Sequence, residues 1–167
     1  MAKIKLKGMP VDTNGKLPDV GNKAPNFELT KTDLSSLSLE SLKGKRVVLN
    51  IFPSLDTSTC AASVRKFNKE AASLKNTVVL AISKDLPFAS ARFCTTENID
   101  NVIPLSAFRD TKFDYEYGML IVNGPLAGLL ARGVVIIDEN GKVMYRQLVE
   151  EITDEPDYEA ALRVLNE

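Results

Sequence analysis

Residues 50–67 read NIFPSLDTSTCAASVRKF, and the change of pattern inside this stretch sets the fold. Its beginning continues the apolar run Arg46–Phe52, which is typical of a strand buried on both faces. Pro53 ends that run, and apolar residues then recur at helical spacing through residues 57–74. A strand, a polar turn and a helix carrying Cys60 in its first turn are therefore expected here.

Short apolar segments alternate with helical patterns along the rest of the chain. Strands are expected at residues 26–30, 77–83 and 102–105, followed by a hairpin at 133–149 that turns at Asn140-Gly141. Helices are expected at 39–44 (one turn), at 87–96, at 113–118 and from Pro156 onward. The alternation in Lys3–Lys16 predicts an edge hairpin turning near Thr13-Asn14-Gly15.

These segments predict one α/β domain over residues 1–167, with a mixed central β-sheet flanked by helices and an N-terminal hairpin extension at residues 1–16. The pattern is compatible with a thioredoxin-like fold, although it does not distinguish that fold from other α/β folds.

Composition excludes several partners. The 21 basic and 22 acidic residues leave a net charge of −1, which gives no electrostatic reason to bind nucleic acid or an anionic membrane. The first residues lack the apolar core of a signal peptide, and the apolar stretch 119–137 is interrupted by Asn123, Pro125 and Arg132. A cytoplasmic protein is expected, in a compartment that keeps thiols reduced.

The chain has two cysteines and no histidine, which excludes Cys/His zinc sites, Ser-His-Asp triads and Cys-His pairs. A reactive Cys60 would need another source of activation. The free N–H groups and the positive dipole end at a helix N-terminus favour a thiolate there. Residues 57–60 read TSTC rather than CxxC, which argues against an ordinary dithiol reductase.

From the pattern alone, each of these residues also has a purely structural interpretation. Cys60 and Cys94 could be packed core residues, Thr57 a plain helix cap and Arg132 a solvated surface charge. Arg65 lies on a different helix face from Cys60 and is expected to be a surface or salt-bridge residue.

The residues 53–60, PSLDTSTC, match the PxxxTxxC signature of peroxiredoxins, and the following ASVRKFN resembles the bacterial thiol peroxidase branch, whose members are atypical 2-Cys peroxiredoxins. Three later segments resemble the same branch: SKDLPFASARFC, GPLAGLLARGVVIIDENGKV and EITDEPDYEAAL. They occur in order from about residue 17 to the end, so the resemblance covers essentially the whole domain.

The resemblance implies a thiol-dependent peroxidase that reduces hydrogen peroxide and organic hydroperoxides. Cys60 matches the peroxidatic cysteine, which becomes a sulfenic acid. Thr57 matches the residue that hydrogen-bonds the thiolate and peroxide, and Pro53 the residue that shields the pocket. Arg132 matches the arginine that polarises the peroxide, and Cys94 the resolving cysteine.

The resemblance further implies an intramolecular Cys60–Cys94 disulfide that thioredoxin reduces, no cofactor or metal, and a homodimer. Because disulfide geometry requires close Cα atoms, local unwinding around either cysteine is expected before the bond closes. The segment Gly118–Leu130 could supply interface or pocket surface, or simply core. Two other functions stay open: a peroxide-sensing switch or binding module that uses the same cysteine pair, and a thioredoxin-like domain with inert cysteines.

Overall fold

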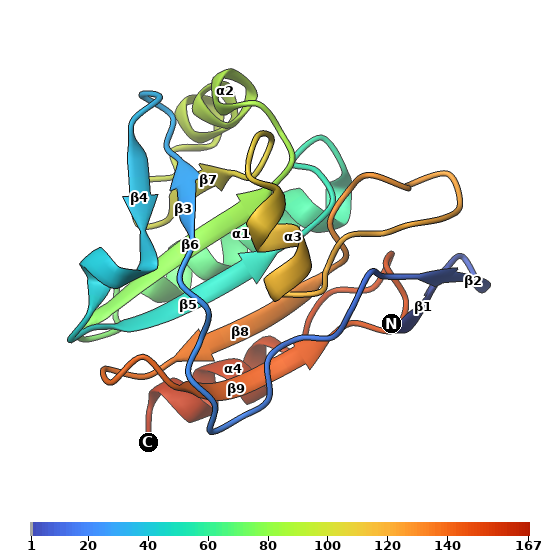
Figure 1. Ribbon diagram of the computed structural model, residues 1–167. Helices are drawn as coiled ribbons and strands as arrows, with labels where there is room; N and C mark the ends of the chain where they lie inside the picture. Colours follow the sequence, from blue (N-terminus) through green and yellow to red (C-terminus); the bar gives the residue numbers. More distant parts are fainter. Residues whose placement is uncertain (1) are drawn as a thin grey trace.

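The computed structural model describes residues 2–167, so that Met1, part of the expected N-terminal extension, lies outside the described residues. A central sheet of seven strands runs through the molecule in the order β4-β3-β7-β6-β5-β8-β9 (Figure 1). The strands of this sheet are β3 (Glu28–Thr30), β4 (Ser36–Ser38), β5 (Arg46–Ile51), β6 (Thr77–Ser83), β7 (Ile103–Ser106), β8 (Gly133–Ile137) and β9 (Val143–Leu148).

The sheet is mixed, as the sequence predicts. Strands β5, β6 and β7 are parallel, whereas β8 runs antiparallel to β5, and β9 runs antiparallel to β8. On the other side, β3 is antiparallel to both β7 and β4. The parallel strands all end at the same edge of the sheet, so the loops that follow β5 and β6 lie near each other.

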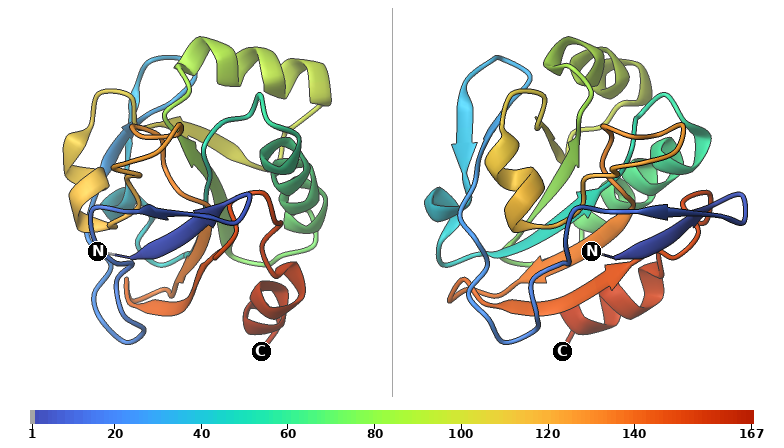
Figure 2. Two further views of the ribbon diagram at one scale, coloured as in Figure 1. Left: turned by 90° about the vertical axis from the view of Figure 1, so that its right-hand side faces the viewer. Right: turned by 45° about the vertical axis from the view of Figure 1, so that its right-hand side comes forward.

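The helices are α1 (Ser58–Ala71), α2 (Pro87–Glu97), α3 (Thr111–Glu116) and α4 (Tyr158–Leu165), with a 3₁₀ turn, η1, at Leu39–Leu42. Helices α1 and α4 lie on one side of the sheet and α3 lies on the other (Figure 2). Among residues 2–167, no helix is both long and apolar enough to cross a bilayer.

The core has two parts, one on each face of the sheet. Alternate residues of β5 enter different parts: Val48 packs beneath α1 and α4, whereas Val47 and Leu49 pack on the face that α3 covers. Cys60 belongs to the first part and is completely buried. Because this part also contacts Cys94, both cysteines adjoin one apolar cluster.

The N-terminal hairpin forms, but its predicted turn is wrong. Strands β1 (Lys3–Leu6) and β2 (Met9–Asp12) meet at Lys7-Gly8, where both residues have positive φ, as hairpin turns with the right twist require. Thr13-Asn14-Gly15 instead runs beside a distant segment, with the Asn14 N–H donating to the Leu120 carbonyl at 2.9 Å. A pairing between segments so far apart in the chain has no signal in the local sequence, so it could not be predicted.

Strand β4 is the one element of the central sheet that the sequence does not predict. It is three residues long and reads SLS, which is too short and too polar to show a strand period. The remaining expected strands and helices occur within a few residues of the predicted bounds. The 133–149 hairpin turns at Asn140-Gly141, as predicted, with Gly141 at φ 82°.

Candidate active site

The Cys60 sulfur lies in the first turn of α1, immediately after the bend that leaves β5. Although it is completely buried, it is not enclosed by apolar groups alone. The Arg132 Nη1 donates to Cys60 Sγ at 3.3 Å, across 72 residues of sequence. The structure thus brings together two of the predicted site residues, from segments that are distant in the sequence.

Arg132 is itself buried, with 2% of its surface exposed. It directly precedes β8, and its Nε donates to the Ile152 carbonyl at 2.8 Å. That carbonyl belongs to the loop after β9, which also contacts α1, because the Thr59 hydroxyl donates to the Thr153 carbonyl at 3.1 Å. The guanidinium is therefore fixed in place between the loop and the sulfur.

Pro53 and Thr57 lie in the bend between β5 and α1. Pro53 is buried, and Thr57 is exposed at the N-cap position. The Thr57 side chain forms no capping bond, so the alternative interpretation of Thr57 as a plain helix cap is wrong; its hydroxyl donates to the Ser54 carbonyl at 2.9 Å. This bond closes the turn, and it leaves the lone pairs of Thr57 Oγ1 available to a donor at the helix start.

Cys94 lies in the last turns of α2 and is half-buried. Burial raises the pKa of its thiol. The backbone of Cys94 forms part of the cap that ends α2, because the Cys94 carbonyl accepts the N–H groups of Asn98 and Ile99. A shallow hollow of about 390 Å³ opens beside it, lined by Cys94, Thr95, Asn98, Ile99 and Asp100. Both cysteines are free thiols in this structure.

Helices α1 and α2 are joined by an ion pair. Arg65 Nη1 lies 3.4 Å from the Glu97 carboxylate at the end of α2, which confirms the salt-bridge interpretation of Arg65. Both side chains are partly exposed, so the pair is worth at most about 1 kcal/mol.

Asp85 is a residue of the candidate site that the sequence does not predict. Its Oδ1 accepts the Ser54 hydroxyl at 2.7 Å, and its Oδ2 accepts the Leu55 N–H at 2.8 Å and the Ser83 hydroxyl at 2.9 Å. One carboxylate thus fastens the bend before Cys60 to the end of β6, which leads into the Cys94 helix. A single aspartate in a loop has no pattern from which this role could have been predicted.

Asn50 and Ser63 are also missed, and they lie directly behind Cys60. Asn50, on β5, donates through Nδ2 to Ser63 Oγ at 3.1 Å. The Ser63 hydroxyl in turn donates to the Cys60 carbonyl at 2.8 Å. Both side chains are buried in the apolar layer between β5 and α1. A polar residue within an apolar strand is the one signal that could have identified Asn50.

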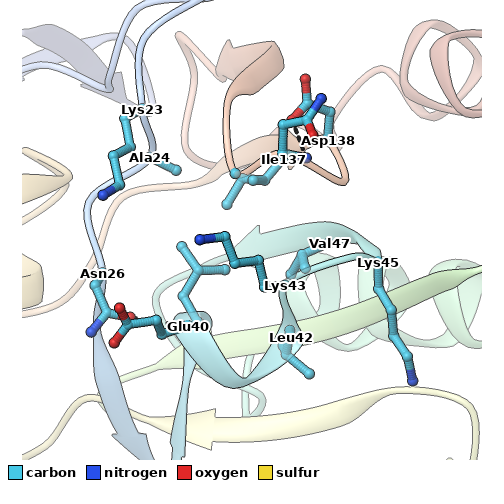
Figure 3. Close-up of a pocket in the computed structure, with 13 residues that line it drawn as sticks. Lys23, Ala24, Asn26, Glu40, Leu42, Lys43, Lys45, Val47, Ile137 and Asp138 are labelled. Atoms are coloured by element: carbon cyan, nitrogen blue, oxygen red, sulfur yellow. Dashed lines mark hydrogen bonds between the residues drawn. The ribbon is translucent and has the colours of Figure 1, made fainter.

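A partly enclosed cavity of about 90 Å³ lies at the start of β5, whereas Cys60 follows the other end of this strand. Val47 and Ile137 line it, together with Lys23, Lys43 and Lys45, of which Lys45 is directed away from the cavity (Figure 3). Neither cysteine lines this cavity, so it is not part of the thiol site.

The family model described as Redoxin matches residues 19–162 of the chain. The chain is 56% identical over 166 residues to a thiol peroxidase of Corynebacterium glutamicum, covering 99% of this chain and 100% of that protein. It is 53% identical to a thiol peroxidase of Mycobacterium tuberculosis over 165 residues, with 99% of each chain covered. The chain belongs to the redoxin family.

Solved structures agree with this family. A crystal structure of a peroxiredoxin-like protein from Aquifex aeolicus has a TM-score of 0.94 and 41% identity, covering 99% of this chain and 96% of that one. A thiol peroxidase from Chromobacterium violaceum has a TM-score of 0.90 at 22% identity, covering 98% and 95%, which supports the fold alone. Within the redoxins, the full-length relatives place this chain among the thiol peroxidases.

Proposed function

We propose that this redoxin is a thiol-dependent peroxidase of hydrogen peroxide and organic hydroperoxides. The observation that supports this most directly is the 3.3 Å contact between the Arg132 guanidinium and Cys60 Sγ at the start of a helix. A thiolate there would lie against a buried cation and the positive end of the α1 dipole. The similarity of this chain to thiol peroxidases supports the same function, the reduction of peroxides by a thiol.

In the first step, the Cys60 thiolate attacks the terminal oxygen of the peroxide. An S–O bond forms, the O–O bond breaks, and the leaving oxygen takes a proton as water or an alcohol; the sulfur is oxidised by two electrons. Arg132 would stabilise the negative charge that develops on the oxygens. Thr57 Oγ1 would orient the peroxide, and Pro53 would keep bulk water from the sulfur.

In the second step, the Cys94 sulfur attacks the Cys60 sulfenic acid. The S–S bond forms within one chain, the S–O bond breaks, and the oxygen leaves as water. Burial, which raises the pKa of Cys94, keeps this thiol protonated and makes it a poor first nucleophile. Because both cysteines lie within helices, we propose that local unwinding brings them together, and the cap on the Cys94 carbonyl would open with it.

A dithiol protein such as thioredoxin would reduce the disulfide by exchange, approaching from the hollow beside Cys94. Residues 1–167 would act as one domain in the reducing cytoplasm, as a homodimer. Thiol chemistry of this kind requires neither a metal nor an organic cofactor.

Serine variants test the assignment of the two cysteines. Cys60→Ser is expected to abolish peroxide consumption in an assay coupled to thioredoxin and thioredoxin reductase. Cys94→Ser is expected to react once, leaving a sulfenic acid that a dimedone probe traps, and then to lose efficient recycling. Appreciable turnover by Cys60→Ser would contradict the nucleophile assignment, and loss of the first oxidation in Cys94→Ser would reverse the roles.

The same assay separates the enzyme from a redox switch built on the same cysteine pair. An enzyme consumes many equivalents of peroxide for each protein molecule while reduced thioredoxin lasts. A switch is oxidised once and then stops, so consumption limited to one equivalent would contradict the peroxidase function.

A further inference from the structure

Behind Cys60 lies a short chain of buried hydrogen bonds that the peroxidase chemistry does not use directly. It runs from the Asn50 amide to the Ser63 hydroxyl, and from that hydroxyl to the Cys60 carbonyl. Asn50 is 1% exposed and Ser63 is fully buried, in a layer otherwise formed by apolar residues such as Val48 and Val64.

This arrangement costs stability. Asn50 Oδ1 is buried and has no hydrogen-bond partner among residues 2–167. An unpaired buried polar atom costs folding free energy, whereas replacing both members of a buried pair by apolar groups is often neutral or stabilising. An apolar pair would therefore be the better choice for packing alone.

The carbonyl that receives the bond is the significant feature. In an α-helix the Cys60 carbonyl accepts the N–H four residues later, and here the Ser63 hydroxyl gives it a second bond. A serine bond back to its own helix does not by itself stabilise the helix, so the connection to the sheet is what matters. Through Asn50 the same bond is fastened to β5 of the central sheet. Unwinding the first turn of α1 requires this additional connection to break.

We propose that Ser63, supported by Asn50, is a positioning residue that keeps the first turn of α1 wound and so sets how fast the oxidised Cys60 can reach Cys94. This inference rests on the proposed function. The sulfenic acid has two fates: attack by Cys94, which gives the disulfide and water, or attack on a second hydroperoxide, which gives a sulfinic acid and an alcohol or water. A helix that stays wound lengthens the lifetime of the sulfenic acid and so favours its oxidation to the sulfinic acid.

Ser63→Ala removes the connection without touching the sulfur. After one equivalent of peroxide, the rate of Cys60–Cys94 disulfide formation is expected to rise roughly three- to tenfold, as the loss of one net hydrogen bond predicts. At excess peroxide, the sulfinic acid fraction measured by mass spectrometry is expected to fall. The rate of the first oxidation is expected to stay within about twofold of wild type, since Arg132 and Cys60 keep their contact.

Two further variants make the result specific. Ser73→Ala removes the same kind of bond at the other end of the helix, where the Ser73 hydroxyl donates to the Glu70 carbonyl at 3.0 Å, and is expected to change nothing. Asn50→Val combined with Ser63→Ala removes both polar groups, which guards against misfolding caused by an orphaned Asn50. The double variant is expected to form the disulfide as fast as Ser63→Ala.

Amide hydrogen exchange in the reduced protein tests the connection independently of the peroxidase reaction. Exchange over residues 58–64 is expected to be faster in Ser63→Ala than in wild type and unchanged in Ser73→Ala. If exchange and disulfide formation both match wild type, the positioning role is overturned while the peroxidase proposal stands. If wild type itself forms no Cys60–Cys94 disulfide, the resolving step of the proposed function fails, and this inference fails with it.

Discussion

At the scale of single residues, the burial of Arg132 needs an explanation, because a guanidinium loses its hydration when it enters the core. Its hydrogen bonds go to the Ile152 carbonyl and the Cys60 sulfur. Within residues 2–167, no carboxylate lies within 4.0 Å of it, in contrast to Arg65 and Arg146, which pair with Glu97 and Asp19. The sulfur is thus the position where a compensating negative charge would be placed.

Arg132→Met tests this role. The side chains are similar in length, so the fold is expected to persist, with a circular dichroism spectrum close to that of wild type. The rate of Cys60 oxidation in single-turnover measurements is expected to fall by about a hundredfold, as when one donor to a developing anion is removed. Arg92→Met, at an exposed position on α2, is the matched control and should react normally. A variant that loses stability but reacts at the wild-type rate would show that Arg132 is only structural.

At the scale of elements, the β1–β2 hairpin is fastened to the loop after β9 by one carboxylate. Glu151 accepts the N–H groups of Gly8 at 2.8 Å and Lys7 at 3.0 Å, in the hairpin turn, and it also accepts the Thr153 N–H. These bonds, that of Gly8 first, lower the pKa of Glu151 to about 2. The same loop supplies the Ile152 carbonyl to Arg132. The hairpin is therefore connected to the candidate site through this loop, which binds the hairpin at Glu151 and the Arg132 guanidinium at Ile152.

The lowered pKa of Glu151 predicts a pH dependence of stability. The folded protein favours the ionised form of the Glu151 carboxyl more than the unfolded chain does. The ionised group therefore stabilises the fold fully above its ordinary pKa of 4.5, and this stabilisation is lost as the pH falls toward 2. Glu151→Gln is therefore expected to be less stable than wild type at pH 7, with a difference that shrinks between pH 4.5 and 2. Urea denaturation across this range measures it.

Glu150→Gln is the matched control for that measurement. The Glu150 side chain forms a largely exposed ion pair with Lys5, and the substitution leaves its backbone bond intact, so stability should be nearly unchanged at every pH. A constant difference between Glu151→Gln and wild type from pH 7 down to pH 2 would contradict the role of the charge.

At the scale of the whole molecule, the exposed apolar side chains are unevenly distributed. Of the eight large hydrophobic residues exposed in the described chain, Leu86, Phe88, Phe108 and Tyr115 belong to the start of α2, the loop before α3, and α3 itself. Figure 2 shows the start of α2 and the loop before α3 on the same side of the molecule. Apolar groups that gather on one side favour an interface over a solvated surface.

The segment Gly118–Leu130, considered as interface or pocket from the sequence, divides into two parts. Met119, Ile121 and Leu130 are fully buried in the core, whereas most of the residues between Ile121 and Leu130 are exposed. Only this outer part of the segment could contribute to an interface between subunits.

The homodimer proposal predicts that Phe88, which is 65% exposed, becomes buried between subunits. Phe88→Ser is then expected to weaken dimerisation by about tenfold or more, because each subunit loses a buried aromatic ring. Sedimentation equilibrium measures the dissociation constant. Val20→Ser, at another exposed apolar residue, is the control and should have no effect. A wild-type protein that is monomeric at micromolar concentration would contradict the proposal.

Local sequence determined most of the elements of this protein. Apolar runs of β-branched residues specify β5, β6 and β8, helical spacing specifies α1, and Asn140-Gly141 specifies a hairpin, because each depends on contacts between residues close in the chain. The residues around Cys60 made it the candidate reactive cysteine, because the motif that they resemble lies within eight consecutive positions. The turn of the first hairpin and strand β4 were not determined in this way.

Tertiary structure alone decided which side chains meet. The Arg132–Cys60 contact joins residues 72 positions apart, and Asp85 reaches Ser54 and Leu55 across 31 and 30 positions. Asn50 and Ser63 meet because β5 lies against α1. Such contacts depend on how the whole sheet is ordered and covered, and a single polar residue carries no local signal of its distant partner.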